Sequence, residues 1–258
     1  MQRPPKGLPL VPVTPLHEAI NRINAKLAEL ANMRLGASEQ ASIRVFVERT
    51  FTQAVLGLSH AETSIDQIAA TQEAPAPDPA TLSGPELKIR RALASIEVVE
   101  QAVEHGAALT TDLLLKIHDP FLDDPSRPSQ SNDAPGAEGN QPAGAMVRVG
   151  AFCQWADADS FKELNALEQS AIVVLRLLEI RPFEEGNIGA ALGAGSLFTM
   201  RAGWPPIIIP RSLRNRFNPA VGEGLKMNTR PLIDLFAESI YDTLNSIIDF
   251  ARTLASRK

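Results

Sequence analysis

The chain has 258 residues, of which 44% are hydrophobic, and it carries 25 Lys and Arg against 30 Asp and Glu, four His and one Cys. This is the composition of a globular protein that is long enough to bury a core. The single cysteine, Cys153, excludes an intrachain disulfide and a cysteine-rich zinc site. The net charge is −5, whereas nucleic-acid-binding proteins usually carry an excess of basic residues. We therefore expect no nucleic-acid partner.

No segment is predicted to cross a membrane. The longest mostly apolar run without a charge, residues 186–200, has 15 residues, and a spanning helix needs roughly 20. The first 13 residues contain prolines that interrupt any signal-peptide core, and they predict a flexible arm. We therefore expect a cytoplasmic protein.

The N-terminal region, residues 1–75, predicts a helical extension. Thr14 and Pro15 form a typical helix start, and apolar residues recur at spacings of three and four over residues 16–30. A second pattern of this kind covers residues 37–58. We interpret the two segments as antiparallel helices that pack against each other. The alternative is a coiled-coil dimer interface, which keeps a homodimer open.

A Pro-rich linker is predicted at residues 76–85, followed by a second region at residues 86–252. Most of this second region has helical spacing. The helices expected there cover residues 86–105, 110–117, 161–180, a stretch rich in small residues from 189 onward, and 231–254.

Two segments of the second region lack helical spacing. Residues 123–145 contain four prolines and no Val, Ile, Leu, Phe, Trp or Tyr, which predicts a mobile surface loop. Residues 146–155 approximate the alternation of a strand, so we predict a small β-hairpin there.

Residues 181–192 read Arg-Pro-Phe-Glu-Glu-Gly-Asn-Ile-Gly-Ala-Ala-Leu and lie between two predicted helices. This segment resembles the signature of the Fic family, which is His-Pro-Phe, any residue, Asp or Glu, Gly-Asn-Gly-Arg, two of any residue and a final Arg. Five of the nine specified positions agree: Pro182, Phe183, Glu185, Gly186 and Asn187. Segments at 109–118, 203–210, 214–221 and 230–236 also resemble the family. The resemblance spans about residues 86–250 and implies an all-α, Fic-type helical bundle with a small β-hairpin flap.

The resemblance also implies a chemistry. Active Fic proteins transfer AMP from ATP to a hydroxyl side chain of a target protein, and the motif His removes the hydroxyl proton. The acidic residue holds Mg²⁺, the Gly-Asn-Gly turn and the helix N-terminus bind phosphates, and the two Arg side chains neutralise phosphate charge. The implied cofactors are therefore Mg²⁺ and ATP. Carried over to this chain, Glu185 is the candidate metal ligand, and the candidate nucleotide- or anion-binding residues are Gly186, Asn187, Ile188 and Gly189.

Four specified positions depart from the motif. Arg181 stands where the family has its catalytic His, and a guanidinium does not accept a proton at neutral pH. Ile188 replaces the second Gly of the turn and adds a branched side chain where phosphates come close. Gly189 and Leu192 replace the two Arg residues, so both phosphate-binding cations are absent.

A second similarity lies at residues 58–63, Leu-Ser-His-Ala-Glu-Thr. Many Fic proteins carry an inhibitory helix with the pattern Ser-Ser-any-Ile-Glu-Gly, whose Glu pairs with the last Arg of the motif. Ser59 and Glu62 fit this pattern, but the position of the partner Arg is occupied by Leu192. The alternative interpretation is an ordinary solvated Glu.

The remaining candidates have simpler interpretations. His105 and His118 are interpreted as helix-end histidines, although His118 begins a His-Asp-Pro-Phe sequence similar to the lost His-Pro-Phe. The arginines at 211, 214 and 216 are interpreted as solvated surface. The sequence thus predicts a degenerate Fic-domain protein that lacks the usual AMP transfer and acts as a pseudoenzyme, regulatory or interaction protein, with at most a residual phosphate or nucleotide site. The alternative is a diverged Fic transferase that moves AMP or another phosphate-containing group to a protein hydroxyl.

Overall fold

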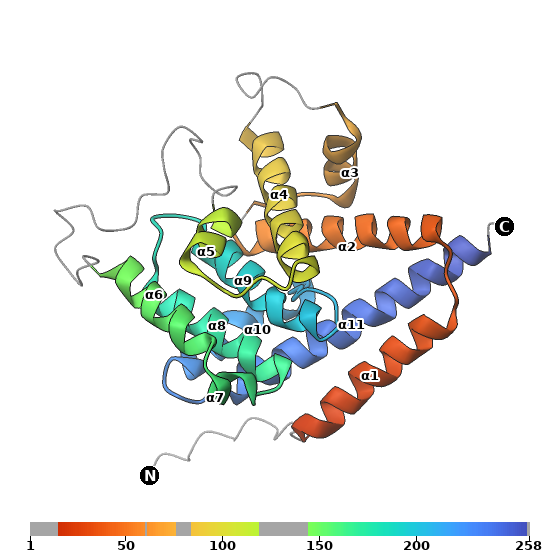
Figure 1. Ribbon diagram of the computed structural model, residues 1–258. Coiled ribbons are helices and arrows are strands. Elements are labelled where there is room, and N and C mark those ends of the chain that lie inside the picture. The colour runs from red at the N-terminus through yellow and green to blue at the C-terminus, as the bar shows by residue number, and fades with distance from the viewer. Residues whose placement is uncertain (1–14, 60, 76–83, 119–143, 257–258) are drawn as a thin grey trace, which may run out of the picture.

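The computed structural model describes residues 15–59, 61–75, 84–118 and 144–256, and within these ranges every regular element is a helix (Figure 1). A short 3-10 helix, Arg211–Leu213, precedes α10. The α-helices are α1 (Leu16–Asn32), α2 (Ala37–Leu58), α3 (Ile65–Glu73), α4 (Gly84–Glu104), α5 (Thr111–His118), α6 (Ala145–Ala156), α7 (Asp159–Lys162), α8 (Ala166–Ile180), α9 (Asn187–Arg201), α10 (Arg214–Gly224) and α11 (Arg230–Ala255). The all-α class expected from the sequence is confirmed.

Helices α8 and α9 form the centre of the bundle, and α9 also packs against α4 and α5. Helix α8 begins with a capping box in which the Asn165 side chain accepts from the amides of Leu167 and Glu168, while Glu168 reaches back to the Asn165 amide. Helix α9 is buried over most of its length because its small residues let neighbours approach closely. A Cβ atom at Gly195 would lie 2.7 Å from Val174 Cγ2 of α8.

The two N-terminal helices do not pack against each other as the sequence suggested. Both α1 and α2 pack against α11 instead, which runs between them in Figure 1. Helix α11 has 26 residues and buries side chains that point in several directions, so it offers contact surface to more than one neighbour. The side chains of Ile23 on α1 and Phe51 on α2 are fully buried in the main core.

Helix α3 is an element that the sequence analysis did not predict. It begins at Ser64, whose hydroxyl accepts from the Gln67 amide while Gln67 accepts from the Ser64 amide. Its Ile68 packs into a second apolar cluster with Leu56 of α2 and Leu93 of α4. The short α3 is therefore held by helices on both sides of the expected linker, most of which lies outside the described residues.

The predicted hairpin at residues 146–155 is wrong, because this segment forms helix α6. Its buried residues are Ala145, Val149, Phe152, Cys153 and Ala156, which follow the three- and four-residue spacing of a helix. Val147 and Trp155, whose place in the alternation suggested a strand, lie on the exposed side of this helix. Within the described ranges no strand is present, and the predicted loop at 123–145 lies almost entirely outside them.

The other predicted helices of the second region are present with shifted boundaries. The segment 161–180 is divided, because α7 ends at Lys162 and α8 begins at Ala166 after the Asn165 cap. The small-residue helix begins at Asn187, two residues before the predicted start. Among the described helices, none combines the length and the apolar character that crossing a bilayer requires.

Candidate functional site

The motif segment forms a tight turn between α8 and α9. Arg181 ends α8 in the left-handed conformation, with φ of 50°, and Gly186 has φ of 70° directly before α9. The Asn187 side chain closes the turn, since its Oδ1 accepts from the Phe183 amide at 3.1 Å and its Nδ2 donates to the Phe183 carbonyl at 2.7 Å. Asn187 thus holds the backbone of the turn with both ends of its amide.

His118, at the end of α5, supports this turn from inside the protein. Its Nε2 lies 2.8 Å from the Glu185 carbonyl oxygen, and because a carbonyl only accepts, Nε2 carries the hydrogen. The imidazole stacks on the Phe183 ring with a centroid separation of 3.5 Å. His118 is 1% exposed, and burial lowers its pKa to about 4. The sequence analysis placed it correctly at a helix end but did not predict its contact with the motif.

The exposed side chains of the turn are Arg181, Glu184 and Glu185. Mg²⁺ in nucleotide sites is commonly held by one or two carboxylates together with substrate phosphates and water. The Glu185 carboxylate fits this role only as a partner of bound phosphates. In the described part of the chain, no group of three or more His, Cys, Asp or Glu side chains is arranged to hold a metal by itself.

The start of α9 presents apolar side chains where the resemblance places phosphate-binding residues. Ile188 is partly buried against the main core, and Gly189 is buried. Leu192 is fully buried and belongs to the core itself. Of the two positions that carry Arg in the family motif, 192 therefore faces the packed core in this chain, and neither position supplies a cation.

Glu62 lies in the connection between α2 and α3 and points toward α10. Its carboxylate pairs with Arg214 at 2.8 Å and lies 3.9 Å from a guanidinium nitrogen of Arg211. Ser59 is the C-cap residue of α2. The arginines interpreted as solvated surface are thus partly engaged, because Arg216 also pairs with Glu238 at 2.7 Å.

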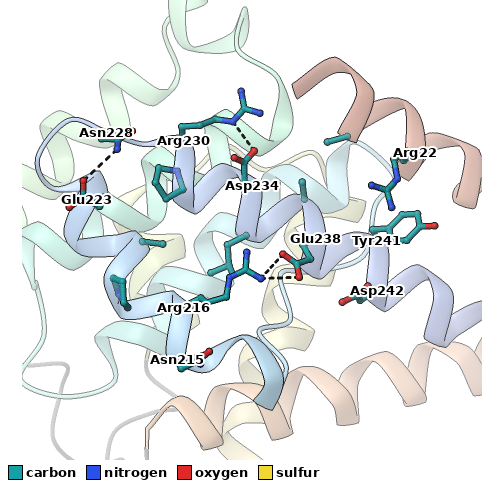
Figure 2. Close-up of a pocket in the computed structure, with 16 residues that line it drawn as sticks. Arg22, Asn215, Arg216, Glu223, Asn228, Arg230, Asp234, Glu238, Tyr241 and Asp242 are labelled. Atoms are coloured by element: carbon teal, nitrogen blue, oxygen red, sulfur yellow. Dashed lines mark hydrogen bonds and ion pairs between the residues drawn. The ribbon is translucent and has the colours of Figure 1, made fainter. Parts of the chain in front are cut away.

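A cavity with a volume of about 1150 Å³, here called the groove, lies between α1, α10 and α11 (Figure 2). None of the motif residues lines it. Its arginines are engaged within the groove: Arg230 pairs with Asp234 at 2.7 Å, and the Arg22 guanidinium lies 4.5 Å from the centre of the Tyr241 ring. Three arginines and four carboxylates line the groove, so it has no excess of positive charge with which to bind an anion.

Cys153 is not a candidate nucleophile. It is buried in the main core from its position on α6. Burial raises the pKa of its thiol to about 11, so the reactive thiolate is scarce at neutral pH.

Comparison with known sequences finds no matching family model, but it finds curated relatives. Protein adenylyltransferase Fic of Drosophila yakuba is 28% identical over 94 residues, which are 36% of this chain and 19% of that protein. The protein of the same name from Drosophila virilis is 25% identical over 104 residues, which are 40% of this chain and 21% of that protein. The matched part is therefore about a fifth of the length of these relatives.

Solved structures match over most of the chain. Fic-1 of C. elegans, residues 134–508, superposes with a TM-score of 0.74 and 16% identity, covering 91% of this chain and 71% of that one. A Fic domain containing signaling protein from Bacteroides thetaiotaomicron superposes with a TM-score of 0.70 and 14% identity. The match covers 92% of this chain and 98% of that one. The relatives found by sequence and those found by structure are all Fic proteins. The chain therefore contains a Fic-family domain.

Proposed function

We propose that this Fic domain lacks the AMP transfer typical of its family and that the protein acts as a pseudoenzyme, in a regulatory or interaction role. The observation that carries this proposal is the absence of the catalytic His from the motif. Arg181 stands at the position of the catalytic His, and in the described part of the chain the histidine that contacts the motif is His118. That imidazole is buried and its Nε2–H is held by the Glu185 carbonyl, so it has no access to a target hydroxyl.

The packing of α9 supports the same proposal. A phosphate clamp requires cations that reach the transferred group, and the side chain of Leu192 is in the core instead. Loss of a general base alone costs on the order of 10² to 10⁴ in rate. What remains is the Gly186 turn, the N-terminus of α9 and the Glu185 carboxylate, which together amount to a residual site for phosphate or nucleotide.

The alternative is a diverged transferase that moves AMP or another phosphate-containing group to a protein hydroxyl. The ordered turn favours it, because Gly186 has the left-handed conformation and Asn187 makes two hydrogen bonds to Phe183. This alternative requires a base other than the missing motif His, such as an exposed carboxylate of the turn or a group of the target protein.

The experiment is incubation of the purified protein with ATP labelled in its α-phosphate, Mg²⁺ and a cell lysate. We expect no labelled protein above background. The informative variants are Glu185→Ala and its matched control Glu184→Ala, since both carboxylates are exposed on the same turn and only position 185 belongs to the motif. Labelling that disappears in Glu185→Ala and persists in Glu184→Ala would establish the transferase.

A thermal-shift measurement with ATP and Mg²⁺ separates a nucleotide binder from a protein that acts only through its surface. A residual site predicts a small rise in Tm that is lost in Glu185→Ala. If millimolar ATP leaves Tm unchanged, the protein has no residual nucleotide site and acts only through its surface.

A further inference from the structure

A second pocket lies at the opposite end of α9 from the motif. Helix α9 ends at Arg201, which is about 21 Å from Asn187 at ~1.5 Å per residue. Arg201 lines a pocket of about 240 Å³ together with residues of α6, α7, α8 and the segment before α5. The pocket is therefore separate from the motif turn and from the groove of Figure 2.

The charge of Arg201 has no carboxylate partner in the described part of the chain. Its Nη2 donates to the Ala107 carbonyl oxygen, and its guanidinium lies 5.5 Å from the centre of the Phe198 ring. The Arg201 side chain is still exposed to solvent on one side, and the partial burial of its guanidinium lowers its pKa. In contrast, Glu100 raises the pKa of Arg44 despite burial, because its carboxylate lies 2.5 Å from that guanidinium. Arg44 thus has a neighbouring carboxylate, whereas Arg201 has none among the described residues.

The other polar residues of the pocket do not supply this anion. The Asp157 carboxylate is bound by Lys162 at 2.9 Å, and the Gln169 amide donates to the Phe161 carbonyl at 3.0 Å. The lining thus holds two cations and one carboxylate, and the carboxylate is already engaged. A net positive charge remains, centred on Arg201.

The remaining lining is apolar. Ala108, Leu109, Ala156 and Phe198 form it, and the latter three are buried core residues whose surfaces close the pocket. A volume of about 240 Å³ is smaller than the ~300–1,000 Å³ of pockets that hold drug-sized ligands. The space therefore fits a small molecule with an apolar body.

We propose that this pocket binds a small organic monocarboxylate, with its carboxylate on the Arg201 guanidinium and its apolar body against Leu109 and Phe198. A guanidinium presents two parallel N–H groups that match the two oxygens of a carboxylate. A single uncompensated cation matches one negative charge. A phosphate group carries more charge and leaves the apolar wall without a partner, so it is a poorer ligand.

The test uses three probes on the full chain, titrated by NMR or calorimetry. Benzoate combines the charge with an apolar ring, benzamide has the same shape without the charge, and inorganic phosphate has the charge without the ring. We expect binding of benzoate, and binding of benzamide and phosphate at least about tenfold weaker, since a charge-assisted hydrogen bond contributes a factor of this order. Equal binding of benzamide, stronger binding of phosphate, or no binding of benzoate at tens of millimolar each overturns the proposal.

The variants Arg201→Gln and Arg201→Lys locate the site. Gln removes the charge and is expected to weaken benzoate binding about tenfold or more, whereas Lys keeps the charge without the paired donors and should give an intermediate affinity. The matched control is Arg176→Gln, which removes an exposed arginine of α8 that already pairs with Glu179. Equal loss in the Arg176 and Arg201 variants would show that benzoate binds through general charge and not in this pocket. A thermal melt of each variant confirms that it is folded.

Discussion

At the scale of single residues, His118 connects the motif turn to the stability of the protein. Burial lowers its pKa to about 4, whereas an unfolded chain has a His pKa of about 6.5. The unfolded state therefore takes up a proton at a higher pH than the folded state does. The contribution of the neutral imidazole to the free energy of unfolding is fully present above pH 6.5 and is lost as the pH drops toward 4. The gap between the two values corresponds to about 3 kcal/mol.

This pH effect is measured by urea unfolding of the wild type and His118→Gln at pH 7 and at pH 4. Gln keeps an N–H donor for the Glu185 carbonyl and does not titrate, so the difference between the two proteins isolates the imidazole from other acid effects. We expect the wild type to lose about 3 kcal/mol more than the variant. The control, His105→Gln, removes an exposed histidine at the end of α4. A wild type that loses no more than His118→Gln would show that the imidazole titrates as it does in water.

Restoring the motif is predicted to fail at Leu192. Because this side chain is fully buried in the core, Leu192→Arg places an unpaired charge there and should cost about 3 kcal/mol or more. Leu192→Met serves as the control of similar volume, with an expected cost below about 1.5 kcal/mol. Thermal melts measure both. A folded variant with His at 181, Gly at 188 and Arg at 189 and 192 that transfers AMP would mean that only the motif residues, and not the packing beneath them, have changed.

At the scale of elements, the contact between α2 and α10 depends on a glycine. A Cβ atom at Gly57 would lie 1.8 Å from Arg214 Nη2, so the guanidinium crosses α2 at this point to reach Glu62 at 2.8 Å. Gly57→Ala should displace the Arg214 guanidinium and weaken its pair with Glu62, so it should stabilise the protein by less than Ala usually does in a helix. In an Arg214→Ala background the obstacle is gone, and the same change should stabilise α2 by up to about 1 kcal/mol, the usual advantage of Ala over Gly in a helix.

Urea unfolding of the four proteins in this cycle tests the contact, because independent sites do not produce an effect that differs between the two backgrounds. If Gly57→Ala has the same effect with and without Arg214, the close approach does not govern the pairing of α2 with α10.

The elements also show how far the sequence could predict the fold. Long amphipathic segments such as α1 and α11 were found because their apolar periodicity is sustained over several turns. Helix α6 was missed because its valines at 147 and 149 approximate the alternation of a strand, although the residues that face the core also recur with helical spacing. Helix α3 has nine residues, too few for a clear pattern. At the site, the motif residues could be recognised, but the contact of His118 with Glu185 joins residues 67 positions apart and has no sequence signal.

At the scale of the whole molecule, the N-terminal helices share their core with the α8–α9 pair. Ile23 and Phe51 belong to the same apolar cluster as Leu192, the Trp204 indole donates to the Asn24 side chain at 3.0 Å, and Arg252 of α11 pairs with Glu29 of α1 at 2.8 Å. We therefore predict that α1 unfolds together with the bundle rather than as a separate extension, in one cooperative transition.

Urea unfolding in a Trp155→Phe background, followed in parallel by far-UV circular dichroism and tryptophan fluorescence, measures this cooperativity, because Trp204 is then the single tryptophan and reports on the contact with α1. The two curves should coincide. Ile23→Ala should shift both to lower urea by the same amount, with a cost of about 2–4 kcal/mol for a fully buried side chain, while Ile65→Ala, at a position that is 37% exposed, should change them little. An early fluorescence transition in Ile23→Ala, with the circular dichroism curve left in place, would show that α1 is a unit of its own. A shared transition would instead mean that whatever binds or alters the N-terminal helices acts on the same folded unit that holds the motif turn.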